Sequence, residues 1–367
     1  MTNVVPADDR QSDSAAPLRD WLNAALLEGA SDLHVVAGGC PLVRVHGELK
    51  QLDTVIVSDV AFRESLTSLI AADQYAQFLE QGNLDASLQF EIDGGKRRFR
   101  VNLFLSTCGA GGCFRVIPDQ IPDFEWAGFP RDLAERLATF RNGLVLFSGV
   151  TGAGKTTSLA MVIELMNQSG GTRIITVEEP VEYLFSRSEN SLVTQREVGA
   201  DVDSFANGLK YGLRQDPDVI LVGEIRDYET AQMAISAAET GHLVFSTLHT
   251  RDAKGAITRL IDLFPQAAQS NVRSQLSMSL RAIVSQHLVP GNRSDRKREL
   301  ALEVMFNNTR MAAAIRMGKL ATIDNTILTG RSEGMINLDA SLRRLLLEQR
   351  ISRETALKYC SPTAELD

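Results

Sequence analysis

At 367 residues the chain is long enough for two domains, since a domain averages roughly 150 residues. Its 44 % hydrophobic and 23 % charged residues exclude a wholly disordered protein. Lys+Arg 38 against Asp+Glu 46, a formal charge of −8, argues against a broad basic surface that coats nucleic acid. The 4 cysteines are scattered, which excludes a disulfide framework and a paired C-x-x-C zinc site. A reducing, cytoplasmic setting is expected.

The first third of the chain predicts a small α+β domain. Residues 1–17 are polar and acidic, without the apolar segment of a targeting signal, and predict a flexible arm. Helical periodicity and strand-like alternation then follow each other, in residues 18–26, 32–36, 42–49, 59–80 and 86–101. Residues 18–117 are therefore expected to form a domain with an antiparallel sheet. Residues 118–123, which contain two prolines, predict a linker.

The pattern changes after the linker. Apolar runs of strand length alternate with helical stretches, the runs being 144–147, 174–177, 192–194, 219–222 and 243–246. This alternation is typical of a mostly parallel sheet covered by helices, so an α/β fold is predicted with its core at 124–265. Residues 266–358 are predicted to be helical throughout, apart from a basic loop at 290–298, and 359–367 to be a tail. No apolar run is long enough to span a membrane.

A phosphate-binding motif follows the first apolar run. Residues 149–156 read GVTGAGKT and fit G-x-x-x-x-G-K-[ST], between a buried strand and a helix. The glycines let backbone N–H groups wrap the phosphates, and the helix N-terminus adds its positive dipole end. Lys155 is expected between the β- and γ-phosphates, and the Thr156 hydroxyl on Mg²⁺. The residues expected to bind nucleotide are Gly149, Thr151, Gly152, Ala153, Gly154, Lys155, Thr156 and Thr157.

Two strands end in carboxylates suited to hydrolysis, which needs a metal partner and a group that orients water. Glu178 directly follows one apolar run, and Glu224 lies two residues after another. Because ligands of open parallel sheets bind outside the carboxyl ends of the strands, both carboxylates can face the phosphate loop. Glu182 and Asp227 are explained equally well as solvated loop charges.

Two of the five histidines flank a single strand. His242 comes directly before the apolar run 243–246, and His249 comes shortly after it. A lone histidine is usually structural, but a pair at one strand of this sheet suggests that one of the two senses phosphate. The catalytic role is assigned to His242.

Four blocks carry a family resemblance. In chain order they are GVTGAGKTT, ITVEEPVEY, DPDVILVGEIRD and AETGHLVFSTLHT. With this order and spacing, residues 18–358 are similar to the type II/IV secretion and pilus motor ATPases, and most of all to their retraction, or twitching-motility, branch. Within that branch, residues 282–290 and the region 311–319 resemble the accessory (PilU) type more than the principal (PilT) type.

The resemblance implies a homohexamer that hydrolyses Mg-ATP between subunits, with a PAS-like domain joined to a RecA-like ATPase domain. It also implies pilus retraction through an inner-membrane platform protein, with the motor cytoplasmic and held at the inner membrane by its partners. By the RecA-like layout, Glu178 activates water and Glu224 belongs to the Mg²⁺ shell, although the two roles could be exchanged. The residues that resemble the phosphate-contacting arginines of the family are Arg98, Arg100 and Arg115; a solvated strand face is the alternative for each.

Three positions depart from the family pattern. Glu179 stands where the family has Asp, and Cys108 stands where it usually has Arg. The segment that reads AIRNLIRE in principal motors is here RMAAAIRM, in which only Ile315 and Arg316 survive. Since that segment resembles an output element, we expect this protein to hydrolyse ATP but to need a paralogous PilT-type motor for force.

Three alternatives fit the sequence less well. A pilus-assembly or type II secretion ATPase of the same superfamily usually carries a longer N-terminal region and a four-cysteine zinc insert, and this chain has neither. A RecA-like nucleic-acid translocase needs basic loops interleaved with aromatic residues, whereas the basic loop at 293–298 contains none. A nucleotide-binding scaffold would not need the carboxylates and arginines. No nucleic-acid partner is expected.

Overall fold

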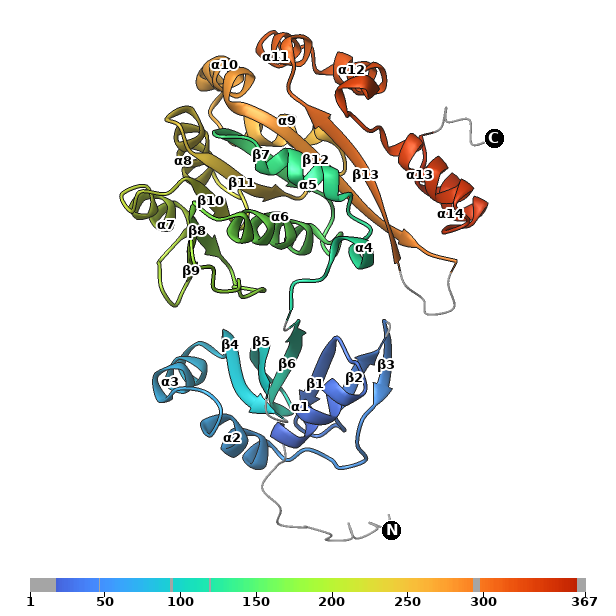
Figure 1. Cartoon of the computed structure of the whole chain (residues 1–367). Coiled ribbons are helices and arrows are strands. Elements are labelled where there is room, and N and C mark those ends of the chain that lie inside the picture. Colours follow the sequence, from blue (N-terminus) through green and yellow to red (C-terminus); the bar gives the residue numbers. More distant parts are fainter. Residues whose placement is uncertain (1–17, 46, 93–94, 119, 293–297, 362–367) are drawn as a thin grey trace, which may run out of the picture. The chain divides into compact units, whose positions relative to one another are not determined.

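The computed structural model describes residues 18–45, 47–92, 95–118, 120–292 and 298–361. These residues form two compact units that divide between residues 119 and 120, inside the stretch expected to be a linker (Figure 1). Three predicted features lie outside the described residues: the arm at 1–17, most of the basic loop at 293–297, and the end of the tail at 362–367.

The first unit is an antiparallel sheet with three helices. The strand order is β3-β2-β1-β6-β5-β4, and every neighbouring pair runs antiparallel. Its strands are β1 Asp32–Val36, β2 Leu42–Val45, β3 Glu48–Gln51, β4 Asn83–Ile92, β5 Gly95–Ser106 and β6 Gly109–Ile117. Its helices are α1 Leu18–Leu27, α2 Asp59–Thr67 and α3 Ala72–Gln81. The predicted antiparallel sheet is thus present.

One face of this sheet is apolar and the other is polar. In β5 the buried residues Phe99, Val101 and Leu103 alternate with Arg100 and Asn102, which are exposed. This period of two follows from the pleat, which turns successive side chains to opposite faces. The apolar face forms the core of the unit together with α1 and the buried Phe62 and Phe78 of α2 and α3.

The second unit is built on a seven-stranded sheet. The order is β13-β12-β7-β11-β10-β8-β9, in which only the β12–β13 pair is antiparallel. The strands are β7 Gly143–Ser148, β8 Arg173–Glu178, β9 Leu192–Glu197, β10 Val219–Val222, β11 Leu243–Leu248, β12 Leu280–Pro290 and β13 Arg298–Phe306. The predicted α/β class is therefore confirmed.

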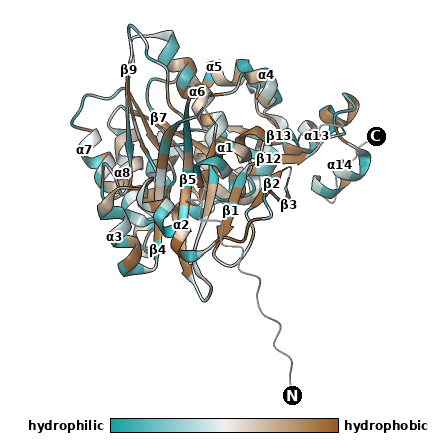
Figure 2. Ribbon diagram, turned by 90° about the horizontal axis from the view of Figure 1, so that it is seen from below, coloured by the Kyte–Doolittle hydropathy of each residue, from teal (hydrophilic) through white to brown (hydrophobic). Residues whose placement is uncertain are grey.

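The helices of the second unit connect and cover these strands. The α-helices are α4 Phe124–Ala127, α5 Arg131–Ala138, α6 Lys155–Ser169, α7 Phe205–Gly212, α8 Tyr228–Glu239, α9 Ala253–Asp262, α10 Gln269–Ser279, α11 Thr309–Arg316, α12 Ile323–Thr329, α13 Leu338–Leu347 and α14 Arg353–Tyr359. Three short 3₁₀ turns are η1 Gln266–Ala268, η2 Leu320–Thr322 and η3 Arg331–Glu333. Helix α5 packs on α6, and α8 packs on α7 and α10. In Figure 2, which colours residues by hydropathy, the strands are on the whole more hydrophobic than the helices.

The prediction that residues 266–358 are helical throughout is wrong. Strands β12 and β13 lie within that range and complete the sheet beside β7. The letters of β13, RELALEVMF, include Leu300, Ala301 and Leu302, residues that favour helices. Antiparallel pairing with β12 over nine residues and burial of most of the strand override that local preference.

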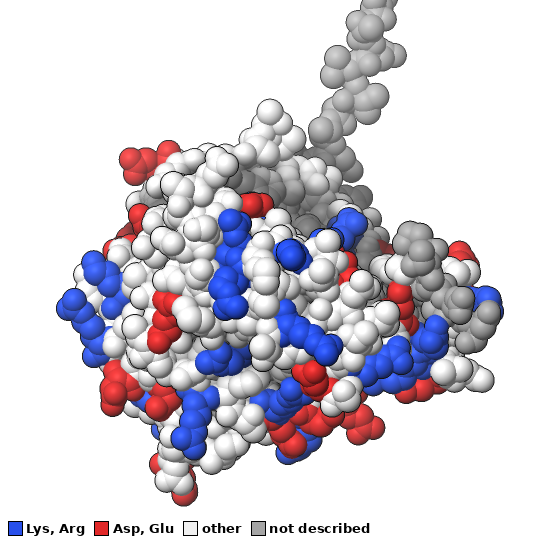
Figure 3. All heavy atoms as spheres, turned by 90° about the horizontal axis from the view of Figure 1, so that it is seen from above, with Lys and Arg blue, Asp and Glu red and all other residues white. Residues whose placement is uncertain are grey.

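Positive and negative side chains are mixed on one face of the molecule. On the face seen in Figure 3, Lys and Arg side chains are interspersed with Asp and Glu side chains. Among the described residues, no helix is both long and apolar enough to cross a membrane.

We predict that the stability of the folded chain depends on pH because of Glu303 on β13. Its carboxylate accepts a hydrogen bond from the Ala253 backbone N–H at 2.8 Å, and burial raises its pKa to about 7 from an ordinary value of 4.5. The folded state therefore binds a proton that the unfolded state releases, and the resulting stabilisation is lost as the pH rises from 4.5 through 7.

The variant Glu303→Gln stays neutral and keeps the accepting oxygen. At pH 8.5 it should be more stable than the unaltered chain by up to about 3 kcal/mol, and the difference should vanish near pH 4.5. Urea unfolding at both pH values measures this, with the exposed Glu354→Gln as the control. A difference between variant and unaltered chain that does not change with pH would contradict the prediction.

Candidate active site

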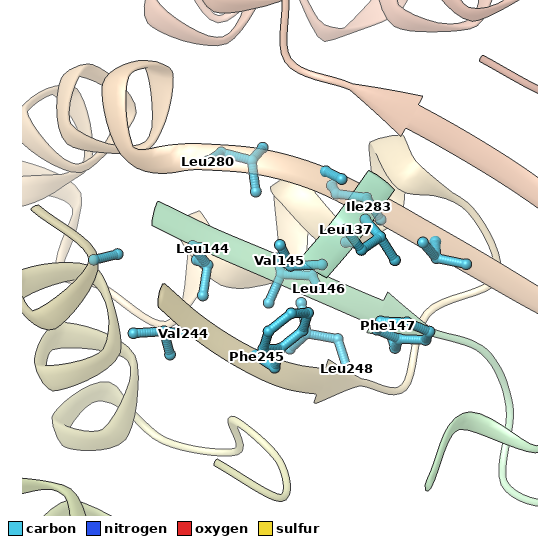
Figure 4. Close-up of a cluster of buried hydrophobic side chains, with 14 of the residues drawn as sticks. Leu137, Leu144, Val145, Leu146, Phe147, Val244, Phe245, Leu248, Leu280 and Ile283 are labelled. Carbon is cyan, nitrogen blue, oxygen red and sulfur yellow. The ribbon is translucent and has the colours of Figure 1, made fainter. Parts of the chain in front are cut away.

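The phosphate loop joins β7 to α6 at the centre of the sheet. Strand β7 is buried at every position, and its side chains pack against β11, β12 and Leu137 of α5 (Figure 4). Between Ser148 and Lys155 the chain turns through three glycines with positive φ: Gly149 at 150°, Gly152 at 77° and Gly154 at 84°. A Cβ atom on Gly149 would lie 2.7 Å from the Gln286 carbonyl oxygen. Only glycine therefore lets the loop pass this close to β12.

The Lys155 side chain is directed back over the loop. Its Nζ donates to the carbonyl oxygens of Gly149 at 2.8 Å and Val150 at 3.3 Å, and the residue is 7 % exposed. Burial lowers the pKa of Lys155, while the carboxylates of Glu224 and Glu182 act in the opposite direction. Both acidic side chains therefore lie near the ammonium group. Glu182, which the sequence did not separate from a solvated charge, is therefore one of two carboxylates whose charge acts on Lys155.

The remaining loop residues lie around the start of α6. Thr156 and Thr157 occupy its first turn, and the Thr157 hydroxyl is 3.0 Å from that of Tyr183. Thr151 is exposed in the loop, whereas Ala153 is buried. Arg298 at the start of β13 donates from Nη1 to the Gly152 carbonyl oxygen at 3.3 Å. Arg298 was part of the basic loop expected from the sequence, but its contact with the phosphate loop was not predicted.

Glu178 ends β8 and is 6 % exposed. Its Oε1 accepts a hydrogen bond from the Thr176 hydroxyl at 2.6 Å and another from Gln195 Nε2 at 3.1 Å. Hydrogen bonds to a carboxylate restrict its rotation. The Glu178 carboxylate is therefore buried and held in one orientation by its two hydrogen bonds.

Glu224 lies beyond the end of β10 in a network of charges. Its Oε1 forms an ion pair with Arg226 Nη2, and its Oε2 is 3.0 Å from His249 Nε2. Arg226 also contacts Glu179 Oε2 through Nη1 at 3.1 Å. Glu179, which is one methylene longer than the Asp expected at this position, thus reaches Arg226. Neither Arg226 nor Glu179 was predicted to belong to the site.

The catalytic role expected of His242 is not supported. His242 precedes β11, its Nδ1 is 3.2 Å from the Ala237 carbonyl oxygen, and its own carbonyl oxygen accepts from Gly143 N–H, where β7 begins. It therefore lies at the amino-terminal ends of the parallel strands, whereas the phosphate loop lies at their carboxyl ends. The other flanking histidine, His249, follows the carboxyl end of the strand and contacts Glu224. Which end of a parallel strand a residue occupies decides whether it can reach the ligand side.

The parts of the site lie at the carboxyl ends of four strands. The phosphate loop follows β7, Glu178 ends β8, and Glu224 and His249 come after β10 and β11. These four strands are parallel neighbours, so their carboxyl ends lie together. Among the described residues, no group of three or more His, Cys, Asp or Glu side chains is arranged to hold a metal ion by itself. A hydroxyl at Thr156 and a carboxylate at Glu224 are the hard oxygen donors that suit Mg²⁺ beside phosphate oxygens.

The three predicted arginines share the polar face of the first unit. Arg100 on β5 and Arg115 on β6 are direct cross-strand partners, and Arg98 lies two residues from Arg100 on the same strand. Arg115 Nε donates to Asp32 Oδ1 at 2.8 Å; its side chain remains 62 % exposed, while that of Asp32 is 7 % exposed. Cys108 is exposed in the turn between the same strands.

Comparison with known proteins identifies the family of this chain. Residues 10–353 match the family model described as "Type II/IV secretion system protein". The chain is 40 % identical to the type IV pilus retraction ATPase PilT of Pseudomonas aeruginosa, over 90 % of this chain and 94 % of that protein. It is 36 % identical to the type IV pilus ATPase PilU of the same organism, over 91 % and 88 %.

A solved structure shows the same fold. A crystal structure of the pilus retraction motor PilT with bound ADP superposes with a TM-score of 0.83 at 38 % identity, covering 93 % of this chain and 96 % of that one. Together, the fold and the site define a P-loop ATPase with a RecA-like core. The chain belongs to the type II/IV secretion system protein family, and the predicted ATPase class is confirmed.

Proposed function

We propose that this protein is a Mg-ATP-hydrolysing motor that drives type IV pilus retraction. The observation that carries the proposal is the buried Lys155 of the phosphate loop, with Glu224 and Glu182 near its ammonium group. Relatives named as pilus retraction ATPases supply the biological context.

The chemistry follows from where these side chains lie. Lys155 and the loop N–H groups bind the β- and γ-phosphates, and Thr156 and Glu224 would hold Mg²⁺. The metal ion, when bound, would neutralise charge that develops on the phosphates. Glu178, oriented by two hydrogen bonds, positions and deprotonates the attacking water. His249 contacts the Glu224 carboxylate and thereby adjoins the γ-phosphate position.

The motor is proposed to be a homohexamer in which the first unit, a PAS-like domain, contributes arginines to hydrolysis. The side chain of Arg100 is exposed, and Arg98 and Arg115 lie beside it on the same face. An arginine that reaches a phosphate only when subunits close couples hydrolysis to domain motion. Loss of such an arginine lowers turnover more than nucleotide affinity, because it acts on the transition state.

The partners proposed for this motor are an inner-membrane platform protein of the pilus and a PilT-type companion motor. The protein would act in the cytoplasm, held at the inner membrane through these partners. Nucleic acid is not proposed as a partner, which agrees with the mixture of charges on the face in Figure 3 and with the net charge of −8.

The accessory assignment rests on α11. Identities of 40 % and 36 % to the two relatives do not separate the two types. Within the segment 310–317, Met311, Ala314 and Ile315 are buried, while Arg310 and Arg316 are exposed. The exposed surface of this segment thus consists mainly of Arg310, Arg316 and Met317, and since most of the polar letters of the principal-motor segment are missing, force transmission should depend on a companion.

The test is genetic. The protein is expressed as the only retraction ATPase in a cell that lacks all others, and in a second cell that keeps one PilT-type motor with impaired hydrolysis. We expect retraction only in the second cell, and loss of it with Lys155→Ala. Robust unaided retraction would contradict the accessory role alone, whereas absence of any effect in both cells would contradict the retraction function.

A further inference from the structure

The two side chains that donate to Glu178 belong to a larger polar arrangement around β8 and β9. Strands β8 and β9 are parallel, and Thr176 is the direct cross-strand partner of Gln195. Because side chains two residues apart on a strand share a face, Thr176, Gln195 and Glu178 all project on one side of the sheet. Both neighbours donate to the same oxygen, Oε1 of Glu178.

The Gln195 amide is held at both of its ends. Nε2 donates to Glu178 Oε1 at 3.1 Å and to the Tyr183 carbonyl oxygen at 2.8 Å, while Oε1 accepts from Phe185 N–H at 3.2 Å. Two acceptors face the NH₂ group and one donor faces the oxygen, so only this orientation of the amide satisfies its neighbours.

The same contacts connect Glu178 to the phosphate loop. Tyr183, whose carbonyl oxygen anchors Gln195, is buried, and its hydroxyl is 3.0 Å from that of Thr157 in the first turn of α6. A chain of hydrogen bonds therefore runs from the nucleotide-binding helix through residues 183–185 to Gln195, and from there to Glu178. Its members come from α6, β8, β9 and the segment between the two strands.

We propose that Gln195 is a positioning residue for hydrolysis: with Thr176, it holds the Glu178 carboxylate in the rotamer that receives the proton of the attacking water. This inference deepens the proposed function and depends on the role of Glu178 in it. A side-chain carboxylate without these donors rotates among several rotamers, and a small displacement of a general base greatly lowers the rate. Gln195 does not touch the nucleotide in this scheme.

The variant Gln195→Leu removes the donor and keeps a side chain of similar size. We expect kcat to fall about tenfold to a hundredfold, the scale of one hydrogen bond to a charged group. The KM for ATP should change by less than about threefold, because the phosphate loop is untouched. The matched control is Gln275→Leu, which removes a 2.8 Å bond from Gln275 Nε2 to the Glu239 carboxylate, between α10 and α8. This control should retain full turnover.

A second pair of variants acts on Thr176 without changing Gln195. Thr176→Val keeps the shape of this buried residue and removes its hydroxyl, whereas Thr176→Ser keeps the hydroxyl. We expect Thr176→Val to lower kcat by a similar factor, and Thr176→Ser to retain most of the kcat of the unaltered protein. This pair keeps the proposal testable if Gln195→Leu unfolds through the loss of its contacts with Tyr183 and Phe185.

A double variant with Glu178→Gln tests the role of Gln195 separately from the role of Glu178. If Gln195 acts through Glu178, then Gln195→Leu should cost little further in a Glu178→Gln background. A fully additive loss, or normal kcat in both Gln195→Leu and Thr176→Val while Glu178→Gln is inactive, would overturn the positioning role and leave the proposed function intact. Normal turnover of Glu178→Gln itself would instead overturn the proposed role of Glu178, and this inference with it.

Discussion

Replacing Lys155 by alanine is expected to abolish ATP hydrolysis and to weaken ATP binding. The residue is almost wholly buried, the charges of two carboxylates act on it, and its place in the motif assigns its point charge to the β- and γ-phosphates. Its loss would leave the negative charge of Glu224 and Glu182 less balanced at the point where phosphate charge must be bound. Removal of a comparable stabilising group costs about 10²–10³ in turnover, and the loss of binding adds to this.

Phosphate release by the purified protein and titration with a fluorescent ATP analogue measure the two effects. Lys210→Ala is the control, because Lys210 is an exposed lysine on α7. Turnover of Lys155→Ala within a few-fold of the unaltered protein would contradict the assignment of the phosphate loop. Since Lys155 also donates to two loop carbonyl oxygens, the thermal midpoint should be recorded for both variants.

Glu178→Gln should leave ATP binding intact and slow hydrolysis by roughly 10² or more, the usual scale for loss of a general base. The substitution keeps shape and retains an oxygen that can accept from Thr176 and Gln195, so the local structure should persist. Single-turnover hydrolysis with saturating ATP measures the chemical step directly. The control is Glu135→Gln on α5, whose side chain is 55 % exposed and pairs with Arg131.

The same experiment on Glu224 decides between the two carboxylates. Both oxygens of Glu224 are engaged, one by Arg226 and one by His249, which fits a metal-shell or electrostatic role better than proton transfer. Glu224→Gln is therefore expected to raise the Mg²⁺ concentration that half-maximal hydrolysis requires, with activity partly recovered at high Mg²⁺. If Glu224→Gln loses only the chemical step while Glu178→Gln remains active, the two roles should be exchanged.

Much of this protein could be predicted from local sequence. The motif at 149–156 combines glycines that adopt positive φ, a strand before them and a helix after them, and all three features depend on neighbouring residues. Period-two alternation identified the antiparallel sheet of the first unit, and buried apolar runs identified the parallel strands of the second. Glu178 and Glu224 were recognisable because each stands at the end of such a run.

Only the tertiary structure decided what depends on contacts between distant residues. Strand β13 forms because β12 lies beside it, in a segment whose letters favour a helix. His249 rather than His242 reaches the site because strand direction places one histidine at each edge of the sheet. Gln195 contacts Glu178 across 17 positions of sequence, and Arg226 contacts Glu179 across 47. Such pairs leave no periodic signal in the sequence, since folding of the backbone, and not spacing along the chain, brings their side chains together.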